Sequence, residues 1–577
     1  MSITIQAGII ASPGIRMGEA YVVAGDNTKF PKYTIKDEDA PYELLRLRSA
    51  VEKTRQDISE IREQTAQSIS SEMSDIFSAH LMFLNDPLFL KQISEEITLK
   101  KRNAEWAADK ISRAFVESLN AADDDYFRER IADIYDISRR VIANLQKRHT
   151  DFISGIEREV ILFAHDITPS EAAIMNRQYI QALVTSQGGK TSHTAIMAKA
   201  LQIPAFVGVK NITFMVKNGD TVIVDAIDGK LIINPDENEI SEFGVKYKEF
   251  NERQAELTKL TSLSARTLDK KDIFIYGNID IPQAAESIQS RGAYGIGLFR
   301  SEFLFLGDSL PDEEKQFKEY KKVVEAFNPR PVTIRTLDAG GDKILPNGKN
   351  RIELNPFLGC RAIRFSIKNK EFFKIQLRAI LRASAFGNVK LMFPMISTPD
   401  ELQQARTITE DVKDSLRKEG IPFDENIQVG IMIEVPSAAI NADILARDAD
   451  FFSVGTNDLI QYLLAVDRIN EDVAHLYNHL DLSLLKILKL IVVTAAERDI
   501  PLSICGEMAG EPMYTMLLLG FGFRRFSMSP DCMPGIKRII RSVTIAECEN
   551  LAKEIMGLYN SEEIENIVRE RFKNKLK

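Results

Sequence analysis

A regular alternation of short apolar runs and helical patterns fills the second half of the chain and restricts it to very few folds. From about residue 270, each apolar run ends in a glycine or a polar group and is followed by apolar residues at helical spacing. The eight runs are Phe274 to Ile279, Gly295 to Phe299, Val332 to Thr336, Val389 to Phe393, Gly430 to Ile433, Phe451 to Val454, Leu502 to Cys505 and Arg525 to Met528. Eight strand-then-helix units over about 270 residues predict a (β/α)8 barrel.

Charged and nucleophilic residues stand at or after the ends of these predicted strands, where such a barrel carries its catalytic groups. They are Arg300, Arg335, Arg361, Arg364, Glu434, Asn457, Asp458, Arg468 and Cys505. Arginine forks bind phosphate and carboxylate oxygens, while carboxylates such as Glu434 and Asp458 suit Mg²⁺. Each residue alone has an ordinary explanation, because an arginine often pairs with an acid and a buried cysteine often only packs. Together they predict a site for a small phosphorylated carboxylic acid.

A second candidate site is the sequence Gly188-Gly-Lys-Thr-Ser-His-Thr-Ala-Ile-Met-Ala198. The glycines allow a tight turn, Thr191 and Ser192 offer capping oxygens, and the run after them favours a helix. His193 is therefore expected near a helix N-terminus, where the dipole attracts an anion and keeps the imidazole neutral and nucleophilic. A phosphohistidine would suit this position, and so would a surface histidine at an ordinary helix cap.

The first 235 residues read as a small α/β unit interrupted by helices. Strand-like runs are expected at residues 3 to 10 and 19 to 23, and again at 159 to 163, 182 to 185, 205 to 208 and 221 to 225. Between them, residues 37 to 149 have few glycines and apolar residues at helical spacing, which predicts an inserted helical bundle. The segment Phe77 to Leu84 contains His80, and its apolar residues either pack in the bundle or dock a partner.

Composition excludes several classes of protein. The chain has 577 residues, 44% apolar and 27% charged, with a formal net charge of −9 and no basic run, so nucleic acid is not an expected partner. No apolar run reaches the ~20 residues of a membrane span, and the first residues lack the features of a signal peptide, so we expect a cytoplasmic protein without membrane insertion. The four cysteines form no C-x-x-C pattern, which argues against a disulfide framework.

Several long, ordered motifs resemble enzyme I of the bacterial sugar phosphotransferase system, over nearly the whole chain. They are the His193 segment, Asp166 to Glu171, Gly297 to Phe305, Asp338 to Lys343, Asn355 to Gly359, Phe451 to Leu459 and Cys505 to Gly510. The resemblance implies an α/β multidomain protein, with a swivelling phosphohistidine domain and its inserted bundle followed by the barrel. The expected boundaries are 1–36 and 150–235 for the phosphohistidine domain, 37–149 for the bundle, 236–262 for a helical linker and 263–577 for the barrel.

The resemblance also implies a reaction and a role for each candidate. Phosphoenolpyruvate would bind at the barrel mouth to Arg300, Arg335, Asn457, Asp458 and Arg468, with Mg²⁺ on Glu434 and Asp458. His193 would attack the phosphorus in line, and Cys505 would protonate the enolate to give pyruvate. His193 would then phosphorylate a histidine of the carrier protein HPr, docked on the bundle at His80, Met82 and Phe83. This reaction is the first step of sugar uptake by the system. The family further implies a homodimer formed through the barrels, and one histidine serving two sites implies a swivelling motion.

Three alternatives compete with this interpretation. A pyruvate phosphate dikinase or phosphoenolpyruvate synthase shares the histidine domain and barrel, but it needs a nucleotide-binding domain, and residues 1 to 187 hold no P-loop. A nitrogen-type relative would carry an additional sensory domain before the α/β unit. A regulator without catalysis would be favoured by loss of His193, Cys505 or a metal carboxylate, and all are present.

Overall fold

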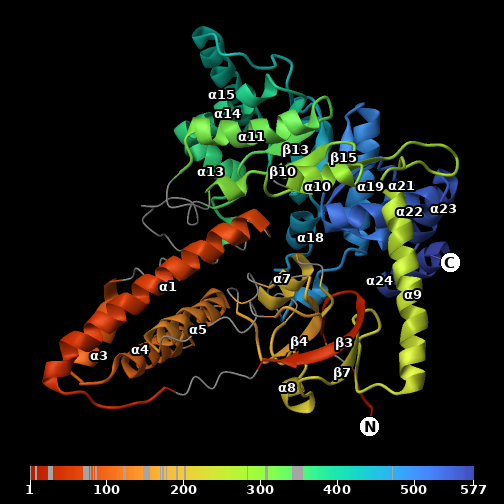
Figure 1. Ribbon diagram of the computed structural model, residues 1–577. Helices are drawn as coiled ribbons and strands as arrows, with labels where there is room; N and C mark the ends of the chain where they lie inside the picture. The colour runs from red at the N-terminus through yellow and green to blue at the C-terminus, as the bar shows by residue number, and fades with distance from the viewer. Residues whose placement is uncertain are drawn as a thin grey trace. The chain divides into compact units, whose positions relative to one another are not determined.

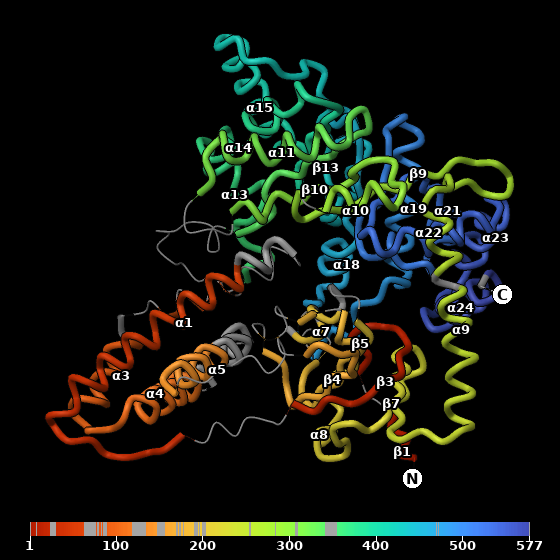
Figure 2. Tube along the Cα trace, in the orientation of Figure 1, coloured from red at the N-terminus to blue at the C-terminus, as the bar shows by residue number. Residues whose placement is uncertain are grey.

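Two compact units, Met1–Glu252 and Arg253–Lys577, divide the chain in the computed structural model (Figures 1 and 2). The described residues are 2–6, 9–23, 30–68, 77, 80–81, 83–84, 87–120, 125–146, 156–168, 171, 175–176, 178–189, 193–200, 203–282, 284–305, 310–340, 355–468, 470 and 472–576.

The second unit contains a closed barrel of parallel strands, which confirms the predicted fold. Its strands are β9 (Phe274–Ile279), β10 (Ile296–Arg300), β11 (Val332–Arg335), β12 (Val389–Phe393), β13 (Gln428–Ile433), β14 (Phe452–Val454), β15 (Leu502–Ile504) and β16 (Arg525–Met528). They follow one another around the barrel in sequence order, and β16 closes it by pairing with β9. All eight predicted strands are present, with ends that differ by two residues at most.

Helices follow most of the strands and cover the outside of the barrel with apolar side chains. They include α10 (Ala284–Ser290), α11 (Glu313–Phe327), α13 (Ala362–Lys368), α14 (Lys370–Ser384), α15 (Pro399–Glu419), α16 (Pro436–Ile440), α17 (Ala442–Leu445), α18 (Thr456–Leu464), α19 (Leu482–Glu497), α20 (Glu507–Gly510), α21 (Thr515–Phe521), α22 (Met533–Arg541), α23 (Ile545–Met556) and α24 (Ser561–Leu576). Local sequence fixes their ends: Thr398 and Glu401 form a capping box at α15, and Gly420 ends it with a positive φ of 68°. Isoleucine, leucine and phenylalanine side chains fill the layer between strands and helices.

The first unit contains an eight-stranded sheet in the order β1-β8-β7-β3-β4-β5-β6-β2. The strands are β1 (Ile3–Gln6), β2 (Ile9–Ser12), β3 (Ile15–Val22), β4 (Val160–Ala164), β5 (Ile180–Thr185), β6 (Ala205–Val207), β7 (Thr221–Asp225) and β8 (Lys230–Ile233). The single strand expected over residues 3 to 10 was wrong, because β1 pairs with β8 while β2 pairs with β6 at the other edge of the sheet. Strand β4 is apolar throughout and β5 is apolar except at Gln181 and Thr185, because parallel neighbours and helices such as α7 (His193–Ala200) and α8 (Ile212–Met215) bury them.

The helical bundle lies in the chain between two strands that pair directly. β3 and β4 are parallel neighbours, with Ala20 opposite Ile161, although more than a hundred residues separate them. Those residues include α1 (Ala40–Ser68), α3 (Pro87–Thr98), α4 (Ala104–Asn120) and α5 (Asp125–Leu145), which pack around their own apolar core (Figure 1). The predicted insertion of a bundle into an α/β domain is therefore confirmed.

One long helix, α9 (Glu237–Leu260), runs across the division between the two units. In the part of the chain that the structure describes, no helix is both long and apolar enough to cross a membrane.

Candidate active site at the barrel mouth

Two arginines end neighbouring strands of the barrel, and each is held by a carboxylate. Arg300 ends β10 opposite Arg335, which ends β11. The Arg300 Nη1 atom lies 3.0 Å from Asp280 Oδ1. Arg335 is buried, and it donates hydrogen bonds to Glu302 Oε1 at 2.8 Å and lies 2.9 Å from an oxygen of Asp338. Burial alone would lower the pKa of Arg335, but Glu302 and Asp338 outweigh it and raise that pKa, so the guanidinium stays charged.

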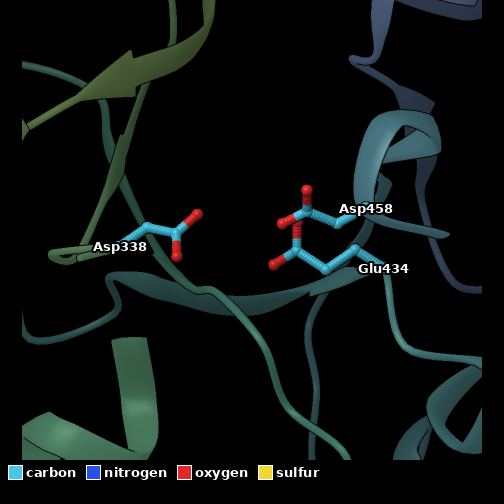
Figure 3. Close-up of side chains that lie close together, drawn as sticks. All are labelled: Asp338, Glu434 and Asp458. Atoms are coloured by element: carbon cyan, nitrogen blue, oxygen red, sulfur yellow. The ribbon is translucent and has the colours of Figure 1, made fainter. Parts of the chain in front are cut away.

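Three carboxylates converge beside these arginines. Asp338 follows β11, Glu434 directly follows β13, and Asp458 lies in the first turn of α18 after β14. Each offers an oxygen that lies within 4.8 Å of the other two, and Figure 3 shows the three carboxylates facing a common space. Glu434 is oriented by the backbone N–H of Met395, which donates to Oε1 at 2.7 Å.

Two of the three carboxylates have pKa values shifted in opposite directions because their surroundings differ. Burial raises the pKa of Glu434 well above its usual range, and the neighbouring Asp338 and Asp458 add to that effect. Burial would also raise the pKa of Asp338, but Arg335 and Arg361 outweigh it and hold that pKa below its usual range. Ionised Glu434 is therefore costly in this position, and a bound cation would reduce that cost.

Arg361 links two of these acids from the long connection after β11. Its Nη2 atom lies 2.7 Å from Asp338 Oδ1 and 3.2 Å from Asp458 Oδ2, and its Nη1 atom donates to the hydroxyl of Tyr462 at 3.4 Å. Sequence reasoning placed Arg361 among the strand-end residues but not in the substrate-binding set. It missed Asp338 and Glu302 as site residues, although both follow a predicted strand within a few positions.

The carboxylate cluster has the donor chemistry that a hard divalent cation requires. Mg²⁺ takes one or two protein carboxylates together with substrate and water oxygens. Two arginines bind Asp338, whereas the one hydrogen bond to Glu434 Oε1 from the described residues comes from the Met395 N–H. A Cβ added at Gly455 would lie 2.8 Å from Glu434 Oε2, so the glycine leaves room for that oxygen. Glu434 and Asp458 therefore fit a cation of this kind.

Asn457 and Arg468 reach the same region from α18 and the segment after it. The Asn457 side chain makes two hydrogen bonds with Glu507. Its Nδ2 atom donates to Glu507 Oε1 at 3.1 Å, and its Oδ1 atom accepts from the Glu507 backbone N–H at 2.9 Å. The Arg468 Nη1 atom lies 3.9 Å from Asp458 Oδ1. The acids and the amide named from the sequence, with Arg300, Arg335, Arg361 and Arg468, thus gather at the carboxyl ends of the barrel strands. Arg364, on α13, instead pairs with Glu401 of α15, its Nε atom 3.6 Å from Oε1.

Cys505 directly follows β15 and is 4% exposed. Its thiol donates to the carbonyl of Val454 at 3.4 Å, and burial raises its pKa to about 11, so it stays protonated at neutral pH. A Cβ at the next residue, Gly506, would lie 1.7 Å from Thr456 Oγ1 and 2.7 Å from the Thr456 backbone nitrogen, so a side chain there would collide with the start of α18.

The His193 segment lies in the first unit, and α7 begins at His193 as the sequence predicted. Lys190 to Ser192 and the His193 side chain lie outside the described residues. Thr194, the next residue, is buried and donates from Oγ1 to the carbonyl of Ile167 at 3.1 Å. Next to Ile167, the backbone N–H of Thr168 donates to Glu171 Oε2 at 2.9 Å, and the backbone N–H of Glu171 donates to Thr168 Oγ1 at 3.2 Å. The start of α7 is therefore tied to the turn after β4.

The candidate carrier-docking residues lie in the bundle. His80 is buried, with Nδ1 3.7 Å from Asp136 Oδ2 and its ring edge-on to Phe77. Phe83 packs against Phe89 and Phe115, and Met82 lies outside the described residues. The described side chains thus contribute to packing, and their role toward a partner stays a prediction.

Comparisons with known proteins match this architecture along the chain. Models of PEP-utilising enzymes match the N-terminal domain at residues 7–130, the mobile domain at 156–229 and the PEP-binding domain at 254–545. The phosphoenolpyruvate-protein phosphotransferase of Geobacillus stearothermophilus is 41% identical over 566 residues, and that of Haemophilus influenzae is 42% identical over 565, each covering 98% of both chains. A solution structure of an enzyme I protein covers 43% of this chain and 100% of its own, with 34% identity and a TM-score of 0.38. The chain therefore belongs to the phosphoenolpyruvate-protein phosphotransferase family.

Proposed function

We propose that this chain transfers the phosphoryl group of phosphoenolpyruvate to its own His193, releases pyruvate, and then phosphorylates a histidine of the carrier protein HPr. The observation that carries the proposal is the convergence of arginines, carboxylates and a protonated thiol at one mouth of the barrel. Family membership supports the same reaction. In this proposal, residues 1–36 and 150–235 carry the phosphohistidine, 37–149 bind the carrier, 236–262 link the units, and 263–577 bind phosphoenolpyruvate.

The arginines have the chemistry to hold both acidic groups of the substrate. Arg300 and Arg335 end adjacent strands, so their forks can bind phosphate oxygens from one side while Asn457 and Arg468 hold the carboxylate. Arg335 is fixed by Glu302 and Asp338 before any ligand arrives, which reduces the ordering that binding requires. We add Arg361 to this set because it joins Asp338 and Asp458 within the same network.

Glu434 and Asp458 are the proposed Mg²⁺ ligands, supported by their closeness and by the raised pKa of the buried Glu434. Mg²⁺ held there would neutralise negative charge on the phosphoryl group during its transfer. The protein prepares this position, since Met395 orients Glu434 and Arg361 orients Asp458.

Cys505 is the proposed acid that protonates the methylene carbon of enolpyruvate. Its thiol keeps its proton at neutral pH because burial raises the pKa to about 11, and its neighbours Leu298, Met392 and Met432 keep water away from it. Proton transfer from a neutral thiol to a carbanion-like carbon produces a thiolate, and Arg335 and Arg300 lie close enough to stabilise that charge.

His193 is the proposed nucleophile, and its position at the start of α7 supports this role because helix N-termini favour phosphate groups. The histidine must reach the barrel mouth and then the carrier, so we propose that its domain swivels about the segment around α9. A cross-link that fixes this segment should stop turnover, whereas unchanged turnover would exclude the swivelling motion.

Carrier docking at His80, Met82 and Phe83, a homodimer and a cytoplasmic location complete the proposal. Support for the homodimer comes from exposed apolar side chains on the contacting helices α16, α17 and α19, namely Ile440, Ile444, Leu490 and Val493. Such a face is typical of a surface that another subunit covers.

The reaction is tested by incubating the protein and Mg²⁺ with labelled phosphoenolpyruvate, with His193→Ala as control and labelled ATP in parallel. Acid-labile label from phosphoenolpyruvate alone, absent in His193→Ala and transferred to added HPr, is the expected result. Label from ATP would instead identify a dikinase, and no label from either donor would leave a regulator without catalysis.

A further inference from the structure

A cavity of about 380 Å³ lies at the end of the barrel opposite the candidate active site. Its walls come from the first residues of the strands and the segments before them, including Tyr276 of β9, Arg330 before β11, Lys390 of β12 and Arg525 of β16. Aromatic rings of Phe274 and Tyr294 complete the wall. We call this space the floor cavity.

Two of its cations extend from different strands into the inside of the barrel. Side chains alternate along a strand, so Lys390 lies on the same face of β12 as Met392, which packs in the interior cluster with Cys505. Arg525 likewise shares a face of β16 with Ser527, whose Oγ bonds the Asn278 amide oxygen inside the barrel. β12 and β16 lie four strands apart around the barrel, so the two cations enter from opposite walls.

No carboxylate in the described part of the chain forms an ion pair with Lys390 or Arg525. Instead, the Lys390 ammonium lies 5.4 Å from the centre of the Phe451 ring, and the Arg525 guanidinium lies 5.9 Å from that of Phe274. These contacts orient the cations but leave their charge unbalanced. Burial lowers the pKa of Lys390, and Arg525 lowers it further, as expected for two positive groups that face the same cavity.

The third cation, Arg330, stands at the exposed rim and donates to the carbonyl of Ala293 at 2.7 Å. None of the described residues that line the floor cavity is acidic. Between this cavity and the mouth, the barrel interior is filled by Leu298, Met392 and Met432. The floor cavity is therefore a separate space with a positive lining.

We propose that the floor cavity is a second ligand site, which binds a small anion carrying several phosphate or carboxylate oxygens. An anion there would supply the counter-charge that Lys390 and Arg525 lack, and the hydroxyl of Tyr276 and the amides of Asn388 and Gln428 add neutral hydrogen-bonding groups. The volume is in the range of small-molecule sites. The inference stands independently of the proposed phosphotransfer, because the floor cavity and the mouth share no residues.

The test is calorimetric titration of the full-length protein at constant ionic strength, with inorganic pyrophosphate in one arm and citrate in the other. We expect at least one of the two to bind, and Lys390→Met and Arg525→Gln each to weaken it about tenfold or more. The tighter of the two anions tells whether the natural ligand is a phosphate or a carboxylate. Lys390→Arg keeps the charge and should retain binding, which separates lost recognition from a damaged fold.

Two controls locate the binding. Lys321→Met removes a lysine of α11 that also lies over an aromatic ring, 3.8 Å from the centre of Phe386. Lys321 does not line the floor cavity, so this variant should leave the affinity for the anion unchanged. Arg361→Gln alters the mouth and should also leave it unchanged. Binding that Arg361→Gln abolishes and Lys390→Met does not would assign the anion to the mouth. Equal binding by every variant, or no binding of either anion below about 10 mM, would overturn the proposal.

Discussion

The two ends of the barrel both carry buried or half-buried cations, but only one end balances them. At the mouth, Arg335 and Arg361 each contact two carboxylates within 3.2 Å. At the floor, Lys390 and Arg525 contact aromatic rings, and no described carboxylate pairs with them. At the mouth, the protein's own carboxylates balance the cations. At the floor, the described residues supply no such counter-charge.

This difference predicts opposite consequences when a cation is removed. Deleting one partner of a buried ion pair leaves the other charge uncompensated, which is strongly destabilising. Deleting a cation that has no partner removes a cost of folding instead. Stability measurements can therefore test the distinction between the two ends without any ligand.

The largest effect is expected for Arg335→Met at the mouth. The substitution leaves Glu302 and Asp338 with less positive charge in a buried position, so the free energy of unfolding should fall by about 3–5 kcal/mol. Denaturant unfolding of the variant measures this change. Arg300→Met is the matched control, because the Arg300–Asp280 pair is 40% and 44% exposed and should cost no more than about 1 kcal/mol. A similar fall in the free energy of unfolding for both variants would show that burial does not make the Arg335 ion pairs more important than the exposed Arg300–Asp280 pair.

Cys505→Ala tests whether a residue at the mouth contributes to the chemical step more than to substrate binding. If the thiol donates the proton, pyruvate formation should slow at least about a hundredfold, while the affinity for phosphoenolpyruvate changes little. Single-turnover kinetics and equilibrium binding measure the two quantities separately. Cys548→Ala removes another buried free thiol, on α23, and should leave turnover unchanged. An equal loss of rate and affinity would reassign Cys505 to packing.

Lys537→Met, with an expected cost of about 2 kcal/mol, shows what a partnered lysine contributes. Its ammonium donates to the carbonyls of Thr261, Arg291 and Gly292 at 2.6, 3.2 and 3.3 Å. Burial and the nearby Arg541 lower its pKa to about 8, so this lysine shares a lowered pKa with Lys390, but it is more deeply buried and has carbonyl partners. Thermal and denaturant unfolding should show a loss, because three carbonyls lose their donor. An unchanged free energy of unfolding would mean that the carbonyl partners of Lys537 do not stabilise the folded protein, and that the two lysines do not differ in this respect.

The fold was predictable wherever the sequence pattern is local and repeated. The barrel strands are short apolar runs, most of them followed by a helix, so the sequence predicted their order and their limits to within two residues. Residues 3 to 10 show the limit of this reasoning. They look like one strand, yet β1 and β2 join opposite edges of the sheet, and that choice depends on partners more than 190 residues away. β8 was missed because its four residues carry little pattern of their own.

The sequence predicted those site residues that stand at, or just after, the end of a barrel strand. Glu434, Asp458, Arg335 and Cys505 lie at the mouth because the barrel brings strand ends together. The sequence did not predict that Asp338 pairs with two arginines, because Arg361 stands 23 residues further along the chain, in a connection whose path the sequence pattern does not show. The floor cavity was not anticipated either, because Lys390 and Arg525 look like ordinary polar residues within strands until the register places both inside the barrel.

The smallest expected effect, and the sharpest test of the comparison, is a gain in stability for Lys390→Met of between zero and about 1 kcal/mol at pH 7. The value is small because water in the cavity screens part of the charge. The gain should also depend on pH. Because the folded-state pKa of Lys390 is lowered, the folded protein is penalised while the lysine is charged, and the penalty disappears as the pH rises through the folded-state pKa toward the ordinary value for lysine.

The stability difference between Lys390→Met and the wild type should therefore shrink between pH 7 and about pH 10. Arg525 and Arg330 also line this cavity, and Tyr276, which faces it as well, keeps its proton because burial raises its pKa to about 12. Denaturant unfolding of both proteins at several pH values gives the difference. A variant that is less stable than the wild type at pH 7, or a difference that grows with pH, would mean that Lys390 has a compensating partner and that the floor is balanced like the mouth.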